Sequence, residues 1–408
     1  MSSESTSLMG RPSTSAAAPE RNVSGVNSRF GAVLVVLFTT GWVANHFVAL
    51  MPAISHREHL GTATLDAVFG IYALGLLPGL LIGGRASDAF GRQAVALAGS
   101  ATAAIGTIAM LLSQHADVLL AGRFIVGAGV GLAMTSGTAW ASDLKGPAGA
   151  ATAGAVMIAG FAIGPFAAGV IAAAGESGIR ISFVVAAVMV VAAMVILIVA
   201  VQRTQAVLPA TTRDSELSTP PQKSSARALS WALPLAPWVF ASATLGFVAI
   251  PARVHTGLAA PMAAGIATML VNGSSGIIQV IARAGKWGPR TGIAGAVLAA
   301  LGYALTALAP GTMGAALSLP LLLILGCASG LSLREGLIDL EAAAPQQVRG
   351  ALTGIFYALT YIGFGLPLLL ATVDPGVSQA ILAAMAVLAS TAAVSRAARL
   401  RRDAHRQN

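Results

Sequence analysis

Runs of about twenty apolar residues recur along almost the whole chain and are separated by short polar stretches. A helix needs about 20 mainly apolar residues to cross a bilayer. Only 10% of the residues are charged, whereas soluble domains carry about a quarter. The sequence therefore predicts an all-α polytopic membrane protein. We predict twelve transmembrane helices at roughly residues 30–53, 66–84, 94–113, 118–142, 150–174, 179–201, 231–251, 259–283, 290–309, 314–340, 347–371 and 376–396.

Polar segments divide these helices into two groups of six. Residues 1–29 are rich in small and polar residues, so we expect a disordered cytoplasmic tail. Residues 202–230 contain prolines, charges and many Ser and Thr, which predicts a mobile cytoplasmic linker. The expected bundles are then 30–201 and 231–396, followed by a basic tail at 397–408.

The positive charges predict the orientation of the chain. Of the 24 lysines and arginines, 19 fall in predicted inner segments, three in outer loops and two within spans. Positive residues accumulate on the cytoplasmic side of membrane proteins. We therefore expect a multi-pass protein of the cell inner (plasma) membrane with both termini cytoplasmic. Because the net charge of +9 lies beside apolar spans, it indicates a lipid bilayer and no nucleic acid as partner.

The two groups of helices also resemble each other in sequence. A shift of 198 residues places Arg85 on Arg283 and Arg92 on Arg290. Parallel repeats of this kind place a pathway at the interface between the halves. The fold that we predict is therefore two pseudo-symmetric six-helix bundles.

A polar, glycine-rich stretch joins the second and third predicted helices at residues 83–93. Its charges exclude it from hydrocarbon, so we expect a short turn at the inner membrane surface. In Gly84-Arg-Ala-Ser-Asp88-Ala-Phe-Gly91-Arg92 this stretch resembles the signature of the major facilitator superfamily. The resemblance implies twelve helices that work by alternating access, and it makes this stretch a gating motif.

Two contacts are expected for the gating motif. Asp143, at the inner end of the fourth helix, is a candidate partner for Arg92. The resemblance implies that Asp88 meets the start of the eleventh helix, near Gly350. The alternative is a solvated loop that carries only orientation charges.

A second motif lies in the fifth predicted helix. Gly160, Gly164, Pro165 and Gly169 are similar to the glycine- and proline-containing motif of the proton antiporters of the same superfamily. We expect the three glycines to keep one helix face flat, so that a neighbouring helix can approach closely. Pro165 lacks a backbone N–H and permits a bend.

Ionisable residues within spans are candidates for coupling. Arg123 also falls in a motif that resembles the family, and a charge at the bilayer centre costs about 3 kcal/mol. His46 is a candidate proton carrier because histidine titrates near neutral pH. Arg334 and Glu335 are adjacent on a helix, so both cannot face one neighbour. For each of them the alternative is a static contact or a surface position. Asp66 is expected at the outer surface.

Polar and aromatic residues at mid-depth are candidates for lining a cavity. The alternative for each is ordinary packing or hydrogen bonding between helices. These candidates are Trp42, Asn45, Asn272, Gln279, Tyr357 and Tyr361.

Enzyme motifs are missing from the sequence. We find no P-loop, no zinc-type His/Cys spacing and no nucleophile elbow, so we expect no enzymatic activity, cofactor or metal. The energy must then come from an ion or substrate gradient. We interpret the chain as a secondary active transporter of a small organic solute, with proton-coupled export as the first hypothesis. The alternatives are a proton-coupled importer or facilitator, and a non-transporting sensor with the same fold.

Overall fold

The structure is a computed structural model that describes residues 18–204, 224–345 and 348–407. Within these ranges, twelve helices are long and apolar enough to cross a membrane, which confirms the predicted number. The first half consists of α1 (Ala18–Glu58), α2 (Thr62–Phe90), α3 (Arg92–Leu112), α4 (Ala116–Ala172) and α5 (Glu176–Thr204). The second half consists of α6 (Ser225–Ala232), η2 (Leu233–Leu235), α7 (Ala236–Thr244), η3 (Leu245–Ala249), η4 (Pro251–Arg253), α8 (Ala260–Ala284), η5 (Gly288–Arg290), α9 (Thr291–Leu308), α10 (Ala315–Ala343), α11 (Arg349–Tyr361), η7 (Ile362–Gly365), α12 (Leu366–Thr372) and α13 (Pro375–Gln407).

Several labels do not correspond to one span each. The label α4 covers two spans, Ala116–Gly146 and Ala148–Ala172, which meet at non-helical backbone at Lys145 and Gly146. The span from α6 to η4 contains prolines that interrupt α-helical hydrogen bonding and leave short 3-10 and π-helical turns. The span from α11 to α12 is interrupted in the same way.

The helices extend further into the polar segments than the sequence predicted. Helix α1 begins at Ala18, so the later part of the expected disordered tail is helical, and α13 continues through the basic tail to Gln407. The last part of the expected linker belongs to α6, which begins at Ser225. Residues 1–17 and 205–223 of the two predicted segments lie outside the described residues.

The predicted turn at residues 83–93 is largely helical, which corrects our expectation. Helix α2 continues to Phe90, and α3 begins at Arg92. The break is confined to Gly91, whose φ of +90° is accessible to glycine and strained for other residues. Arg85 and Asp88 are therefore carried on an extension of α2, and Arg92 begins α3, so the charges of this stretch need no extended loop.

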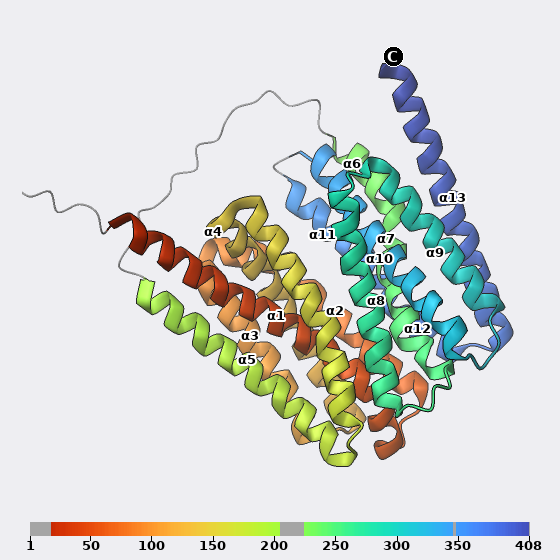
Figure 1. The fold of residues 1–408 in the computed structure, drawn as a ribbon, viewed down its shortest axis with the longest axis horizontal. Coiled ribbons are helices and arrows are strands. Elements are labelled where there is room, and N and C mark those ends of the chain that lie inside the picture. The colour runs from red at the N-terminus through yellow and green to blue at the C-terminus, as the bar shows by residue number, and fades with distance from the viewer. Residues whose placement is uncertain (1–17, 205–223, 346–347, 408) are drawn as a thin grey trace, which may run out of the picture.

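Figure 1 shows the helices of the first half (red to yellow-green) beside those of the second half (green to blue). In this view the start of α6 and the end of α13 lie at the top, and the end of α5 lies at the left, at the upper end of that helix. Arginines are concentrated at this end, and we call it the inner end and the opposite one the outer end. The largest buried apolar cluster contains residues of both halves, such as Phe69 and Phe247, so the core is continuous across their interface.

Candidate transport site and gates

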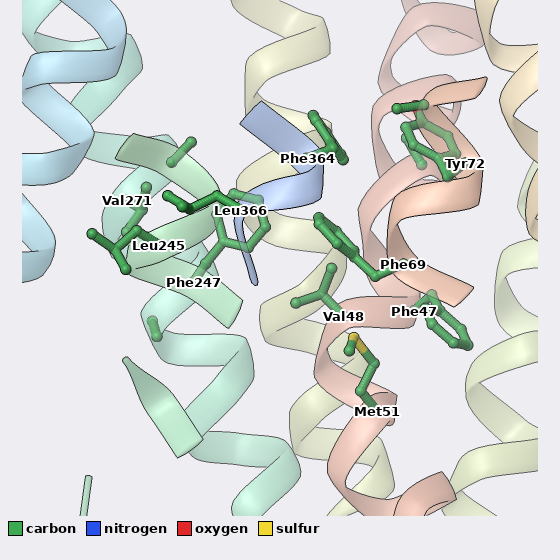
Figure 2. Close-up of a cluster of buried hydrophobic side chains, with 14 of the residues drawn as sticks. Phe47, Val48, Met51, Phe69, Tyr72, Leu245, Phe247, Val271, Phe364 and Leu366 are labelled. Carbon is green, nitrogen blue, oxygen red and sulfur yellow. The ribbon is translucent and has the colours of Figure 1, made fainter. Parts of the chain in front are cut away.

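Aromatic side chains close the outer half of the interface between the two halves. The ring of Phe69 in α2 is stacked on that of Phe364 in η7, with 5.0 Å between ring centroids. Phe247 in η3 meets the edge of Phe69 at 6.0 Å. Figure 2 shows these rings between the helices of the two halves. This packing leaves α2 in contact with the second half near the outer end.

Backbone-to-backbone contacts close the same interface between α4 and α8. A Cβ atom placed on Gly265 would lie 2.6 Å from the carbonyl oxygen of Pro165, and one on Gly169 would collide with that of Pro261. Side chains are therefore excluded at both positions. The outer half of the interface has no room for a solute here.

Gly160, Gly164 and Gly169 do not share one helix face, which corrects the prediction. Gly160 and Gly164 face α1, where Cβ atoms would meet Phe38 and Trp42, whereas Gly169 faces α8. At 3.6 residues per turn, nine residues correspond to two and a half turns, so Gly160 and Gly169 point in opposite directions. The second span of α4 therefore has two tightly packed faces, one for each half of the molecule.

Two predicted cavity residues converge on one backbone carbonyl. Asn45 in α1 and Asn272 in α8 both direct their amide nitrogens at the carbonyl oxygen of Phe161, at 3.5 Å and 3.3 Å. Pro165 lies four residues later and has no N–H to donate to this oxygen. The carbonyl that Pro165 leaves without a helical donor therefore accepts a hydrogen bond from each half.

A cavity of about 600 Å³ lies between the halves on the inner side of this contact. It is lined by the second span of α4, by α8 and by Arg334 of α10. Of the predicted cavity residues, Gln279 lines it. The interface is thus held together in its outer half by aromatic and backbone contacts, with smaller cavities of about 380 and 420 Å³ at its outer edge, while the cavity of about 600 Å³ lies in its inner half.

The tyrosines that we expected in the cavity belong to the aromatic cluster instead. Tyr361 is stacked on Phe240 with 4.5 Å between centroids and lies 5.4 Å from Phe364. Tyr357 lies beside Tyr361 and Phe356. Trp42 is buried against Gly164, so the structure does not join it to the tyrosines.

Arg123 is buried completely within the first half. It donates a hydrogen bond from Nη1 to the carbonyl oxygen of Ala44 at 3.0 Å, while its Nε and Nη2 have no hydrogen-bond partner among the described residues. The guanidinium lies 4.4 Å from the ring centroid of Tyr72 and 5.0 Å from that of Phe47. Desolvated cation–π contacts of this kind contribute about 2 kcal/mol each, which offsets much of the cost of the buried charge.

Two further titratable groups are buried without a salt bridge. His46 is fully buried, with Nδ1 3.0 Å from the carbonyl oxygen of Val43 and Nε2 without a partner. Asp66 is 4% exposed and lines a cavity of about 380 Å³ between α2 and the outer ends of the second half. We expected Asp66 at the outer surface, and its burial between the halves corrects that expectation.

Glu335 belongs to a buried charge network at the inner end of the second half. Arg396 in α13 donates Nη2 to Glu335 Oε1 at 2.9 Å and Nη1 to Asp339 Oδ2 at 2.6 Å. Arg334 lies 3.7 Å from Glu335 Oε2 and lines the cavity. Of these two adjacent residues, Arg334 therefore faces the cavity and Glu335 faces Arg396 of α13. Sequence reasoning missed Arg396, which we had counted among the inner surface charges.

The gating motif contains the ion pair that we expected. Arg92 donates Nε to Asp143 Oδ2 at 2.8 Å, and its Nη1 lies 2.7 Å from Asp88 Oδ1. The Asp88 side chain is 68% exposed. We expected Asp88 to meet the start of the eleventh span near Gly350, and the side chains at that point lie outside the described residues. Gly84 and Gly91 lie on either side of Asp88 along the chain.

The fold and the interface define a polytopic membrane protein with a cavity between two helical bundles. The sequence profile of the Major Facilitator Superfamily matches residues 33–368. The chain belongs to this superfamily, a family of transporters.

Individual relatives and structures agree with this assignment. Over 98 residues the chain is 32% identical to the multidrug resistance protein MdtL of Shigella flexneri serotype 5b (strain 8401) and 31% identical to MdtL of Escherichia coli O139:H28 (strain E24377A / ETEC). Each match spans 24% of this chain and 25% of the relative, so the chain matches only a quarter of these proteins' length.

Solved structures share the fold over nearly the whole chain. A crystal structure of the peptide transporter POT in complex with sulfate has a TM-score of 0.74 at 15% identity, with 93% of this chain and 94% of that chain covered. The inward open conformation of the xylose transporter XylE from E. coli has a TM-score of 0.65 at 15% identity, with 91% and 95% covered.

Proposed function

We propose that this transporter exports a small organic solute by alternating access, in exchange for protons, with both termini in the cytoplasm. The observation that carries the proposal is the interface between the halves. Its outer half is closed by the Phe69 stack and the Gly265 contact, while a cavity of about 600 Å³ lies in its inner half. A solute bound there would be taken up from the arginine-rich side.

Two observations support export. The partial sequence match is to proteins named for multidrug resistance. The second span of α4 carries the glycine- and proline-containing motif similar to that of proton antiporters, and its Gly160 and Gly164 pack directly on α1. A helix packed on backbone can rock without side chains interlocking, because small residues let helices approach closely.

Buried titratable groups support coupling to protons. An ionised carboxylate without a partner is costly inside a membrane protein, so Asp66 is stable at the closed outer interface when it carries a proton. Opening the outer side would separate α2 from the second half and bring Asp66 into water. His46 has a free Nε2 and provides a second proton-accepting atom beside Arg123's helix. In this scheme Arg123 positions α1 and α2 and does not bind the solute.

The proposal is tested with purified protein in proteoliposomes that contain a pH-sensitive dye and face a panel of small organic compounds. We expect at least one compound to collapse an imposed proton gradient and to move in the direction opposite to the protons. Movement in the same direction would indicate import, and a response to no compound in the wild type would contradict coupled transport.

A second measurement isolates coupling from binding. Asp66→Asn should lower gradient-driven accumulation at least about tenfold, the effect expected for loss of a proton-transfer group, while solute-for-solute counterflow persists. Asp117→Asn, an exposed acid at the outer end of α4, is the matched control and should behave as wild type. Equal losses of accumulation and counterflow in Asp66→Asn would mean that Asp66 is structural.

A further inference from the structure

The inner cavity has an unbalanced charge. Arg283 at the inner end of α8 and Arg334 of α10 both line it, and no acidic residue is among its described lining residues. A concave site with one sign of charge concentrates ligands of the opposite sign. The cavity therefore favours anions over cations.

Neither guanidinium is saturated by the protein. Arg283 is exposed, and within the described ranges the structure records no hydrogen bond or ion pair for its guanidinium. The ion pair of Arg334 is a long one, 3.7 Å to Glu335 Oε2, and the other oxygen of Glu335 is already bound by Arg396 at 2.9 Å. Both arginines therefore retain N–H donors that an acidic group can use.

The opposite wall of the cavity is apolar and made of small side chains. Gly154, Ala155 and Ala159 of α4 face Gly273 and Ile277 of α8. The volume of about 600 Å³ falls within the range of roughly 300–1,000 Å³ that is usual for small-molecule sites. A flat or bulky apolar body fits such a wall without displacing charged groups.

The buried Arg123 does not provide this chemistry. It is fully buried between α1, α2 and α4, and it does not line the inner cavity. The accessible guanidiniums are those of Arg283 on α8 and Arg334 on α10.

We propose that the inner cavity binds an amphipathic organic anion, whose acidic group is held by Arg283 and Arg334 and whose apolar body lies on the α4 wall. This inference names the substrate class of the export site and so rests on the proposed function. The anion is a solute taken from the inner side and not a structural lipid.

The binding test uses protein in phosphatidylcholine nanodiscs and three naphthalene probes of nearly equal size, by isothermal titration calorimetry against empty nanodiscs. The probes are naphthalene-2-sulfonate, the neutral naphthalene-2-sulfonamide and the cationic 2-naphthylmethylammonium. We expect the sulfonate to bind at least about tenfold more tightly than the other two, because charge-assisted hydrogen bonds are the strong ones. Its affinity should fall as salt is added.

Matched variants locate the site. Arg283→Gln combined with Arg334→Gln should weaken sulfonate binding at least about tenfold and leave sulfonamide binding unchanged. A protein with Arg283→Gln and Arg334→Lys should bind the sulfonate more tightly than the double glutamine variant, because the lysine restores one positive charge. A misfolded protein would not recover binding in this way. Arg290→Gln, an exposed arginine at the same end that does not line the cavity, should bind like the wild type.

Three outcomes would overturn the inference: equal affinity for sulfonate and sulfonamide, full sulfonate binding by the double variant, or loss of sulfonate binding in nanodiscs that contain phosphatidylglycerol. The last result would mean that an anionic lipid occupies the cavity. Sulfonate binding without transport would support the anion site and contradict the proposed function. Coupled transport of cations without sulfonate binding would support the proposed function and contradict the anion site.

Discussion

Arg396 and Arg123 are both buried arginines, and their surroundings differ in a way that sets their roles. Arg396 is 5% exposed and is balanced by Glu335 and Asp339. Arg123 has aromatic faces and one carbonyl but no acid. The ion pairs of Arg396 join α13 to α10. Arg123, by contrast, keeps two nitrogens without a hydrogen-bond partner among the described residues of the first half.

We expect Arg396→Gln to lower the stability of the protein by about 3–5 kcal/mol, because it leaves Asp339 without its cation and the buried Glu335 with only the more distant Arg334. Thermal unfolding of the purified protein in detergent measures this loss. Adding Glu335→Gln and Asp339→Asn to the same chain should recover most of it. Arg399→Gln, one turn along the same helix and exposed, should cost no more than about 1 kcal/mol. An unchanged melting temperature for Arg396→Gln would contradict the role of the network.

At the scale of the element, the second span of α4 connects the two halves. Gly160 packs on α1, Gly169 packs on α8, and the carbonyl of Phe161 accepts hydrogen bonds from Asn45 and Asn272. Pro165, which permits a bend, has no N–H, so the carbonyl of Phe161 is left to accept these two bonds. Movement of α8 away from α4 at the outer end must break the bond to Asn272, and the bond to Asn45 lies within the first half.

We therefore expect Asn272→Leu to weaken the inward-facing state. A hydrogen bond contributes about 1 kcal/mol net, so the ratio of inward-facing to outward-facing molecules should fall about fivefold. Spin labels at Ser177 and Thr256, exposed outer positions in opposite halves of a Cys327→Ala chain, report the separation by pulsed electron resonance. The control is Thr268→Val, because the Thr268 hydroxyl bonds only to Ala264 in its own helix. An unchanged label distribution in Asn272→Leu would show that the bond does not bias the cycle.

At the scale of the whole molecule, the two sides of the interface between the halves are packed differently. Aromatic rings and backbone-on-backbone contacts hold the outer half together beside the smaller cavity at Asp66, and the larger cavity lies on the inner side. Because packed interfaces have discrete arrangements and do not deform continuously, an obstacle at the outer contact must favour the opposite state.

Gly265→Val tests this interface. Its Cβ would lie 2.6 Å from Pro165 O, and overpacking of this kind costs about 1–3 kcal/mol. We expect the outward-facing population to rise at least about fivefold, with longer outer label distances and lower turnover. Gly273→Val in the same helix meets nothing within 4 Å and should keep the wild-type distances. Similar distributions for the two variants would argue that the outer contact is not the gate.

Many features of this protein followed from the sequence alone. The helix number, the approximate span positions and the Arg92–Asp143 pair were all predicted, since residues near the ends of short connections have few possible neighbours. The reason for the spans is local. In hydrocarbon every backbone polar group must be satisfied within its own helix, so a run of apolar residues has one stable structure.

The tertiary structure alone decided which side chains meet across helices. It packed Gly160 on α1 and Gly169 on α8, drew Arg396 into a buried network, moved Tyr357 and Tyr361 into an aromatic cluster, and directed two asparagines at the carbonyl of Phe161. These contacts join residues far apart in the chain, such as Asn45 and Phe161, which are 116 positions apart. Small residues allow many helix pairings of nearly equal quality, because lipid is as apolar as the helix surfaces and does not select among them. The rotation of each helix, and with it the site, is therefore a property of the assembled bundle.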